Sequence, residues 1–251
     1  MTKFTSNSKE VLDNIPEELR AADIKEIDLS SDSIPETRAL GIRWKVADDV
    51  FSFKVALEEK PATRRGILAT ICSVFDPLGM AAPVMLRGKR LLRQICEENI
   101  DWDANVSEEL KREWKKFRDE LSGLRQLKIG RSLIDDLTME DMEILELHHF
   151  SDGAKLGYGQ CSYLRAIAKD GRIIVKFVIG KSRVVPKEEP TTPRIELTAA
   201  LTSVRVASAI TREIDLPIQK SVFWTDSKVV LGYIANEEKD LSSMWLTAYM
   251  K

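Results

Sequence analysis

The stretch Ile144-Leu145-Glu146-Leu147-His148-His149-Phe150-Ser151-Asp152-Gly153-Ala154 decides the fold of the C-terminal hundred residues. Its apolar beginning alternates in the way that a strand does, and it delivers the carboxylate of Asp152 just before a glycine. Two more carboxylates follow in matching settings, because Glu196 opens a long helix and Asp226 closes an apolar strand at 222–225. We therefore expect Asp152, Glu196 and Asp226 to converge on one site.

Each of these acids also has an ordinary structural explanation. Asp152 before Gly153 would serve in a turn, Glu196 would suit the first turn of a helix, and Asp226 or Ser227 would cap a short helix. Taken together they favour a binding site, because carboxylates that meet without cationic partners repel one another unless a divalent ion neutralises them. Hard oxygen ligands of this kind suit Mg²⁺ or Mn²⁺ better than zinc.

The pattern of the C-terminal segment predicts a mixed α/β sheet. Three strands are expected at 144–151, 157–167 and 172–180, the last two joined by a hairpin turn at Asp170-Gly171. Thr192 is expected to cap a helix that has Pro193 at its first position and ends near residue 214. A fourth strand at 221–225 and a short helix at 228–235 complete the order. The helix side that carries Glu196 also bears small residues, which permit a close approach to the sheet: Ala199, Ala200, Ser203 and Ala207.

The preceding segment predicts a hairpin followed by helices. Two β-prone runs at 39–46 and 50–55 flank Asp48-Asp49, a pair that is either a common turn or a metal ligand of the polymerase kind. Thr63 is expected to cap a first helix, and further helices are expected at about 83–99 and from Ser107. The last of these carries an apolar stripe at helical spacing: Leu110, Trp114, Phe117 and Leu121. A connector at 124–143 is the expected domain boundary.

Composition places the chain among ordinary globular proteins with a locally basic part. The 251 residues carry a net charge of −2, with 43% hydrophobic and 31% charged residues. Residues 152–200, however, carry 9 Lys and Arg against 5 Asp and Glu, which is compatible with a phosphate-bearing partner. The candidate nucleic-acid contacts are Arg87, Arg90, Lys111, Lys115, Lys181, Arg183, Arg194 and Ser227. The alternative is that such charges only keep helices soluble.

Cysteine usage and hydropathy exclude several classes. The three cysteines are widely spaced and form no C-x-x-C, so neither a disulfide framework nor a zinc site is indicated. No run of apolar residues is long enough to span a membrane, and the polar N-terminus is not a signal peptide. An intracellular location, cytoplasmic or nuclear, is expected.

Three groups of residues resemble the ribonuclease H domain of a retroelement reverse transcriptase, in particular the BEL/Pao class of LTR retrotransposons. They are Phe75-Asp76-Pro77-Leu78-Gly79, then Pro193-Arg194-x-Glu196-Leu197, and Trp224-Thr225-Asp226-Ser227. The resemblance implies an end of a polymerase palm at 1–60, a helical thumb or connection segment at 61–143, and an incomplete ribonuclease H-like domain at 144–251. It implies that the rest of a reverse transcriptase polyprotein is a partner.

By this resemblance Asp152, Glu196 and Asp226 hold Mg²⁺ or Mn²⁺ in an endonuclease that cuts the RNA strand of an RNA–DNA hybrid. Two departures matter. Asp48-Asp49 does not match the paired aspartates of the polymerase, and no polymerase or peptidase motif is present. The segment after Asp226 supplies no match for the family's fourth acid, since Asp240 lies too early, so weak activity is expected. The alternatives are a non-catalytic nucleic-acid-binding remnant and an unrelated α/β domain.

Overall fold

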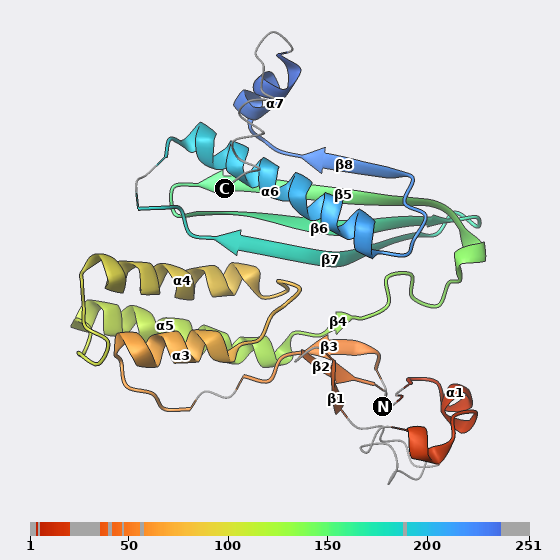
Figure 1. Ribbon diagram of the computed structural model, residues 1–251, viewed down its shortest axis with the longest axis horizontal. Helices are drawn as coiled ribbons and strands as arrows, with labels where there is room; N and C mark the ends of the chain where they lie inside the picture. Colours follow the sequence, from red (N-terminus) through yellow and green to blue (C-terminus); the bar gives the residue numbers. More distant parts are fainter. Residues whose placement is uncertain are drawn as a thin grey trace. The chain divides into compact units, whose positions relative to one another are not determined.

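The computed structural model describes residues 4, 6–20, 36–39, 42–46, 48–55, 58–187 and 190–236. The chain divides into two compact units, one made of Met1–Pro77 and Arg87–Asp135 and the other of Leu78–Leu86 and Asp136–Lys251. Figure 1 labels the helices and strands of both. Across the described ranges, no helix has the length and apolar character needed to cross a membrane. The question of how residues 240–251 fold lies outside the described residues.

The first unit contains a small antiparallel sheet in the order β1-β2-β3-β4. Its strands are β1 (Glu36–Ala39), β2 (Ile42–Lys45), β3 (Val50–Ser52) and β4 (Ile129–Gly130). The expected hairpin is present as β2 and β3, which pair from Lys45 with Val50 onward. Asp49 has a positive φ of 49° and accepts hydrogen bonds from Trp44 Nε1 at 2.9 Å and Arg131 Nε at 2.6 Å. Asp49 is thus a turn residue held by its neighbours, as the turn interpretation of this pair predicted.

The first unit also contains short α1 (Lys9–Asp13), α3 (Arg64–Ser73) and α5 (Glu108–Gly123), together with the part of α4 (Ala82–Glu97) from Arg87 onward. The predicted caps are confirmed, because Thr63 Oγ1 accepts from Gly66 N at 3.2 Å and Ser107 Oγ accepts from Leu110 N at 3.4 Å. The predicted stripe of α5 is buried: Leu110, Trp114, Phe117 and Leu121. Gly88 of α4 packs on the Phe117 ring.

The second unit is built on a four-stranded mixed sheet in the order β7-β6-β5-β8. Long β5 (Met142–Ala154), β6 (Gly157–Ala168) and β7 (Ile173–Arg183) are antiparallel to one another, and β8 (Lys220–Trp224) runs parallel to β5. The hairpin between β6 and β7 turns at Asp170-Gly171, where Gly171 has a φ of 86° that favours glycine. The predicted α/β fold is confirmed. Strand β5 begins two residues earlier and ends three residues later than the pattern indicated, β6 ends one residue later, and β7 begins one residue later and ends three residues later.

One face of this sheet is covered by α6 (Thr192–Glu213) (Figure 1). Buried residues on α6 recur at helical spacing and include Ile195, Ala199, Ser203 and Ala207. Three of the four small residues predicted for this side are therefore buried, while Ala200 is only partly buried. The N-cap is Thr191 and Pro193 is the second helical residue, so the prediction that Thr192 caps α6 is wrong by one position. The chain continues through β8 to α7 (Lys228–Ala235), whose bounds match the expectation.

A polar group lies in the core beneath α6. His149 on β5 is fully buried, and its Nδ1 lies 2.8 Å from Ser162 Oγ, which donates to Gln160 Oε1 at 3.0 Å. In the arrangement in which Ser162 donates to Gln160, the neutral His149 ring carries its proton on Nδ1 and donates it to Ser162 Oγ. Its Nε2 has no partner among the described residues. Burial, and secondarily the neighbouring His148, lower the pKa of His149 to about 4, so the ring is neutral near pH 7.

Aromatic rings occupy the other face of the sheet. Phe150 of β5 stacks with Trp224 of β8, with ring centroids 6.0 Å apart, and meets Tyr163 of β6 edge to face. Trp224 Nε1 donates to His148 Nδ1 at 3.0 Å, and Ser151 Oγ donates to Trp224 O at 3.4 Å. These contacts fix the carboxyl end of β5 against the carboxyl end of β8.

Candidate active site

Parallel pairing of β5 with β8 brings the ends of these strands together. Phe150 and Trp224 are partners in the register, and each is followed two residues later by an aspartate, Asp152 and Asp226. Equal offsets beyond a parallel register pair place both aspartates at the same end of the sheet. Asp152 lies within β5 and not in a turn, so the simple turn explanation for it is wrong. Both side chains are exposed.

Glu196 reaches the same end of the sheet from α6. It is the fifth residue of α6, and the first turn of this helix contains no acidic residue, so the helix-dipole explanation for Glu196 is wrong. Its backbone lies against Gly153, where an added methyl group would come within 2.9 Å of Glu196 N. Gly153 is therefore the residue that lets α6 approach β5 immediately beside Asp152.

A hydrogen bond joins Glu196 to the segment that carries Asp226. Ser227 Oγ donates to Glu196 Oε2 at 2.5 Å, a length expected for a hydroxyl on a carboxylate. Ser227, and not Asp226, is the N-cap of α7, since its Oγ accepts from Val230 N at 3.2 Å. The structure thus brings the three acid-bearing segments together through two contacts, one between Gly153 and Glu196 and one between Ser227 and Glu196.

Two of the three carboxylates accept a hydrogen bond from a nearby residue. Asp152 Oδ1 accepts from the neighbouring Gly153 N at 2.6 Å, and Glu196 is held by Ser227. No set of three or more His, Cys, Asp or Glu side chains in the described residues is arranged to hold a metal ion. Within the same residues no lysine or arginine forms an ion pair with Asp152, Glu196 or Asp226. The donors are oxygen ligands without cationic partners, which is the chemistry that Mg²⁺ or Mn²⁺ requires, although an ion would have to draw the carboxylates closer together.

The candidate nucleic-acid contacts fall into two classes. Arg87 is engaged by Glu120 and, at 3.8 Å, by Glu113, while Lys111 pairs with Glu108 at 3.4 Å. A second class is exposed and has no carboxylate partner within the described part of the chain: Arg90, Lys115, Lys181, Arg183 and Arg194. Ser227 is buried, with 6% of its surface exposed. Its hydroxyl donates a hydrogen bond to Glu196 and accepts one from Val230 N.

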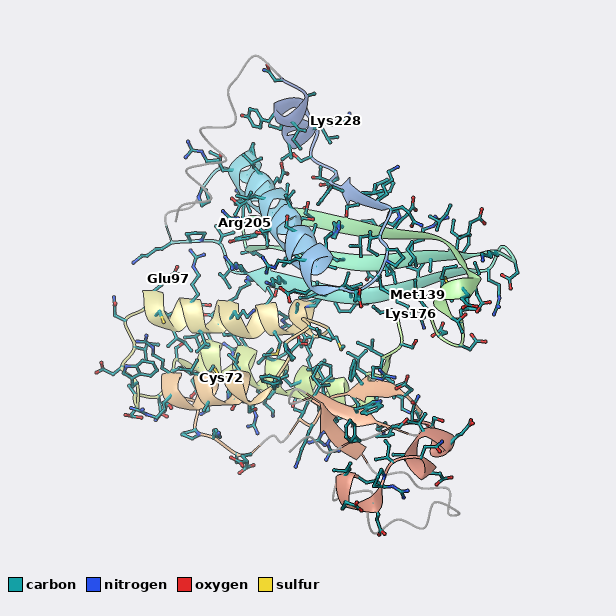
Figure 2. All side chains as sticks on the ribbon, turned by 45° about the vertical axis from the view of Figure 1, so that its right-hand side comes forward. Cys72, Glu97, Met139, Lys176, Arg205 and Lys228 are labelled. Atoms are coloured by element: carbon teal, nitrogen blue, oxygen red, sulfur yellow. The ribbon has the colours of Figure 1, made fainter. Side chains whose placement is uncertain are left out.

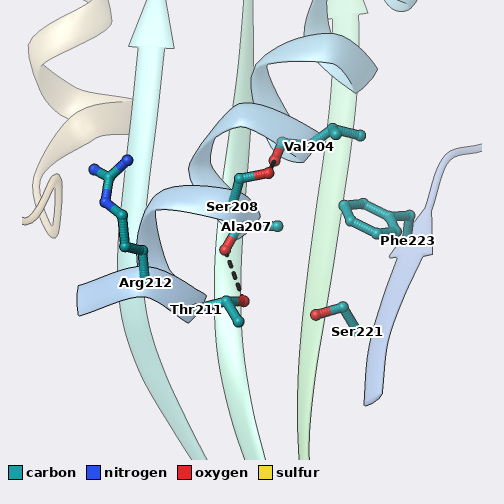
Figure 3. Close-up of a pocket in the computed structure, with 7 residues that line it drawn as sticks. All are labelled: Val204, Ala207, Ser208, Thr211, Arg212, Ser221 and Phe223. Atoms are coloured by element: carbon teal, nitrogen blue, oxygen red, sulfur yellow. Dashed lines mark hydrogen bonds between the residues drawn. The ribbon is translucent and has the colours of Figure 1, made fainter. Parts of the chain in front are cut away.

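Two hollows flank α6, and neither contains the three acids. One, of about 430 Å³, lies between α6 and β8 and is lined by residues that include Val204, Ala207, Ser221 and Phe223 (Figure 3). The other, of about 470 Å³, lies between α6 and β7. Its floor is mainly apolar, and Lys181, Arg183 and Arg205 line it, the last projecting from α6 (Figure 2). The cations of β7 thus lie on the side of the sheet that α6 covers.

The sequence does not indicate the role of Gly153 or the partner of Ser227. The close approach of Gly153 to Glu196 depends on the packing of α6. Ser227 is predicted as a cap or nucleic-acid contact, but its partner Glu196 lies 31 positions away in the chain. A serine directly after the last strand signals the cap, whereas no local signal indicates the distant carboxylate.

A protein family and several solved structures are similar to parts of this chain. The model of the Pao retrotransposon-like RNaseH-like domain matches residues 63–227, which is more than half of the chain. No curated protein matches. Among solved structures, the foamy viral protease-reverse transcriptase dRH in complex with double-stranded DNA matches at 14% identity and a TM-score of 0.46, over 86% of this chain and 36% of that one. The foamy viral protease-reverse transcriptase in complex with double-stranded DNA matches at 16% identity and a TM-score of 0.24, over 85% of this chain and 42% of that one.

This chain spans less than half the length of either foamy viral chain. The family assignment rests on the match at residues 63–227, which includes Glu196 and Asp226 and ends at Ser227. The chain belongs to the Pao retrotransposon-like RNaseH-like domain family.

Proposed function

We propose that this chain is a metal-dependent endonuclease that cuts the RNA strand of RNA–DNA hybrids, with Asp152, Glu196 and Asp226 as the metal-binding and catalytic residues. The observation that carries the proposal is the position of Glu196, which contacts Gly153 beside Asp152 and is hydrogen-bonded to Ser227 beside Asp226. The segments that carry the three acids therefore lie at one end of the sheet, and a shared divalent ion would explain why acids without cationic partners are placed there.

Oxygen donors without cationic partners favour Mg²⁺ or Mn²⁺. When bound, a pair of such ions supplies an activated water molecule and stabilises the leaving oxygen of an in-line displacement. Asp152 and Asp226, at adjacent strand ends, would hold the ions between them, and Glu196 would approach from α6.

The hybrid would be held by cations outside this group of acids. Arg194 lies two residues before Glu196 and is exposed. Lys181 and Arg183 line the groove between β7 and α6. Their positive charge would bind the phosphate backbone in a salt-dependent way and would not distinguish sequences.

The test is cleavage of a labelled RNA–DNA hybrid in Mn²⁺ by the wild-type chain and by Asp152→Asn, Glu196→Gln and Asp226→Asn. We expect each substitution to slow cleavage by more than about 100-fold, since even groups that only orient metal ligands are worth about 10–100-fold. Glu143→Gln, at the opposite end of β5 and exposed, is the matched control and should cleave normally. Equal product release by wild type and Asp152→Asn would refute the proposal.

A second candidate function is nucleic-acid binding without catalysis. It is favoured by one observation, that the side chains in the described residues form no ready metal-binding group of three. In that case hybrid binding would weaken with salt and no cleavage would occur at any Mn²⁺ concentration. Fluorescence anisotropy with the same labelled hybrid, run beside the cleavage assay, separates the two functions.

A further inference from the structure

Ser227, at the junction between β8 and α7, makes three hydrogen bonds. Its side chain is buried, its backbone N donates to Thr225 Oγ1 at 3.2 Å, and its Oγ accepts from Val230 N at 3.2 Å as the cap of α7. The first bond spans Asp226, and the second ties Ser227 to the first turn of α7. A residue anchored in this way can impose its geometry on whatever its hydroxyl proton contacts.

The proton of Ser227 Oγ goes to Glu196. A hydroxyl has one proton and two lone pairs, so a cap that accepts from Val230 N leaves the proton free to donate to Glu196 Oε2, 2.5 Å away. A carboxylate offers about four lone pairs, so this bond orients Glu196 and leaves most of its acceptor capacity for a cation. No other side chain in the described residues donates a hydrogen bond to this carboxylate.

We propose that Ser227 is a positioning residue that holds the Glu196 carboxylate against the Asp226 segment and so aligns the two acids for a shared divalent ion. This inference rests on the proposed function, because it assigns a metal-binding role to Glu196 and Asp226. The sequence predicts Ser227 as a nucleic-acid contact. Its hydroxyl is buried and already makes two hydrogen bonds, so we assign it to positioning Glu196 and not to binding a phosphate.

Two substitutions at this position separate positioning from capping. Ser227→Ala removes the donor and the cap together, while Ser227→Thr keeps a hydroxyl that can do both. Ser107→Ala is the matched control, because Ser107 caps α5 in the same way, through Leu110 N, without touching an acid. The probe is Mn²⁺ itself, measured as free ion by electron paramagnetic resonance during titration of the full chain.

We expect Ser227→Ala to weaken Mn²⁺ binding by about 10–100-fold, the usual effect of removing a group that orients a metal ligand. Ser227→Thr should stay within about threefold of wild type, and Ser107→Ala should change only the thermal stability. Unchanged Mn²⁺ affinity in Ser227→Ala would overturn the inference, as would equal losses in Ser227→Ala and Ser227→Thr, which would indicate a purely structural role.

A metal-free measurement distinguishes failure of this inference from failure of the proposed function. In EDTA, the loss of Tm caused by Ser227→Ala should be smaller in the Glu196→Ala background than in wild type, because Glu196→Ala already removes the acceptor of the hydrogen bond that couples the two residues. If the acids bind Mn²⁺ but the Tm losses simply add, the positioning role is overturned while the nuclease proposal stands. If wild type binds no Mn²⁺, the proposed function and the positioning role both fall.

Discussion

The backbone of Gly153 lies in van der Waals contact with the backbone of Glu196, so that a methyl group on Gly153 would come within 2.9 Å of the Glu196 amide nitrogen. This contact joins the strand that carries Asp152 to the helix that carries the second acid. The separation between these acids is therefore set by a residue that has no functional group of its own.

Replacing Gly153 with alanine should push the beginning of α6 away from β5. The three atoms that meet the new methyl group belong to Ile195 and Glu196, and two of them are backbone atoms that cannot rotate aside. We expect a loss of about 1–3 kcal/mol in the free energy of unfolding, measured by urea denaturation. Mn²⁺ affinity should fall in the same variant.

Gly232 provides the control for this substitution. A methyl group added to Gly232 in α7 meets no atom within 4 Å, so Gly232→Ala should be neutral or slightly stabilising. A Gly153→Ala variant as stable as Gly232→Ala, with unchanged Mn²⁺ affinity, would contradict the idea that Gly153 sets the spacing.

Burial of His149 should make the second unit acid-sensitive. Its pKa is about 4 in the folded chain, below the ordinary value of 6.5, so the folded state binds fewer protons than the unfolded state between these values. The stability that His149 contributes is fully present above pH 6.5 and is lost as the pH falls toward 4. At pH 4.5 the loss should be about 2–3 kcal/mol relative to pH 7.

Many carboxylates titrate in the same pH range, so the effect of His149 is measured as the difference in stability between wild type and a variant without the histidine. Urea midpoints of wild type and His149→Gln should converge as the pH is lowered from 7 to 4.5, because the glutamine cannot be protonated. Parallel pH profiles for the two proteins would show that His149 is protonated without cost in the folded chain.

Packing of α4 against α5 should be sensitive at Gly88. An added methyl group would lie 2.6 Å from Phe117 Cζ and 3.0 Å from Ile71 Cγ1, and Phe117 is fully buried. Alanine is the better helix former by about 1 kcal/mol, but overpacking costs about 1–3 kcal/mol, so we expect Gly88→Ala to lower Tm. The reduction should be smaller in a Phe117→Leu background, where the ring no longer fills the space. A stabilised Gly88→Ala would show that the helices can move apart at little cost.

Hybrid binding should depend on the unpaired cations more than on the paired ones. The double variant Lys181→Ala, Arg183→Ala should weaken binding and reduce the slope of log affinity against log salt by about 2, one for each lost phosphate contact. Arg87→Ala should have a smaller effect, because Arg87 already pairs with Glu113 and Glu120. Anisotropy titrations between 50 and 200 mM salt (about the range where such slopes are clear) would measure both. Equal effects of the two variants would show that the groove between β7 and α6 is not a contact.

The sequence predicts most of the second unit because its signals are local. Asp170-Gly171 marks the hairpin between β6 and β7, and the small residues of α6 mark the face that packs on the sheet. The sequence does not predict β1 or β4. Strand β4 has only two residues and is defined by its pairing with β3, and β1 is likewise defined by its pairing with β2. The same limit applies to the candidate site. Asp152, Glu196 and Asp226 stand out by type and context, but the bond from Ser227 to Glu196 and the place of His149 in the core arise only when distant segments pack.

The parallel pairing of β8 with β5 has a consequence for handling this molecule. Along its other side, β8 has no strand neighbour among the described residues, and Phe223 and Trp224 are 46% and 49% exposed. The backbone amides and carbonyls on this side, beside two partly exposed aromatic rings, can accept an extended segment from another molecule by strand addition. Concentrated solutions are therefore expected to form oligomers through the strand that leads to Asp226.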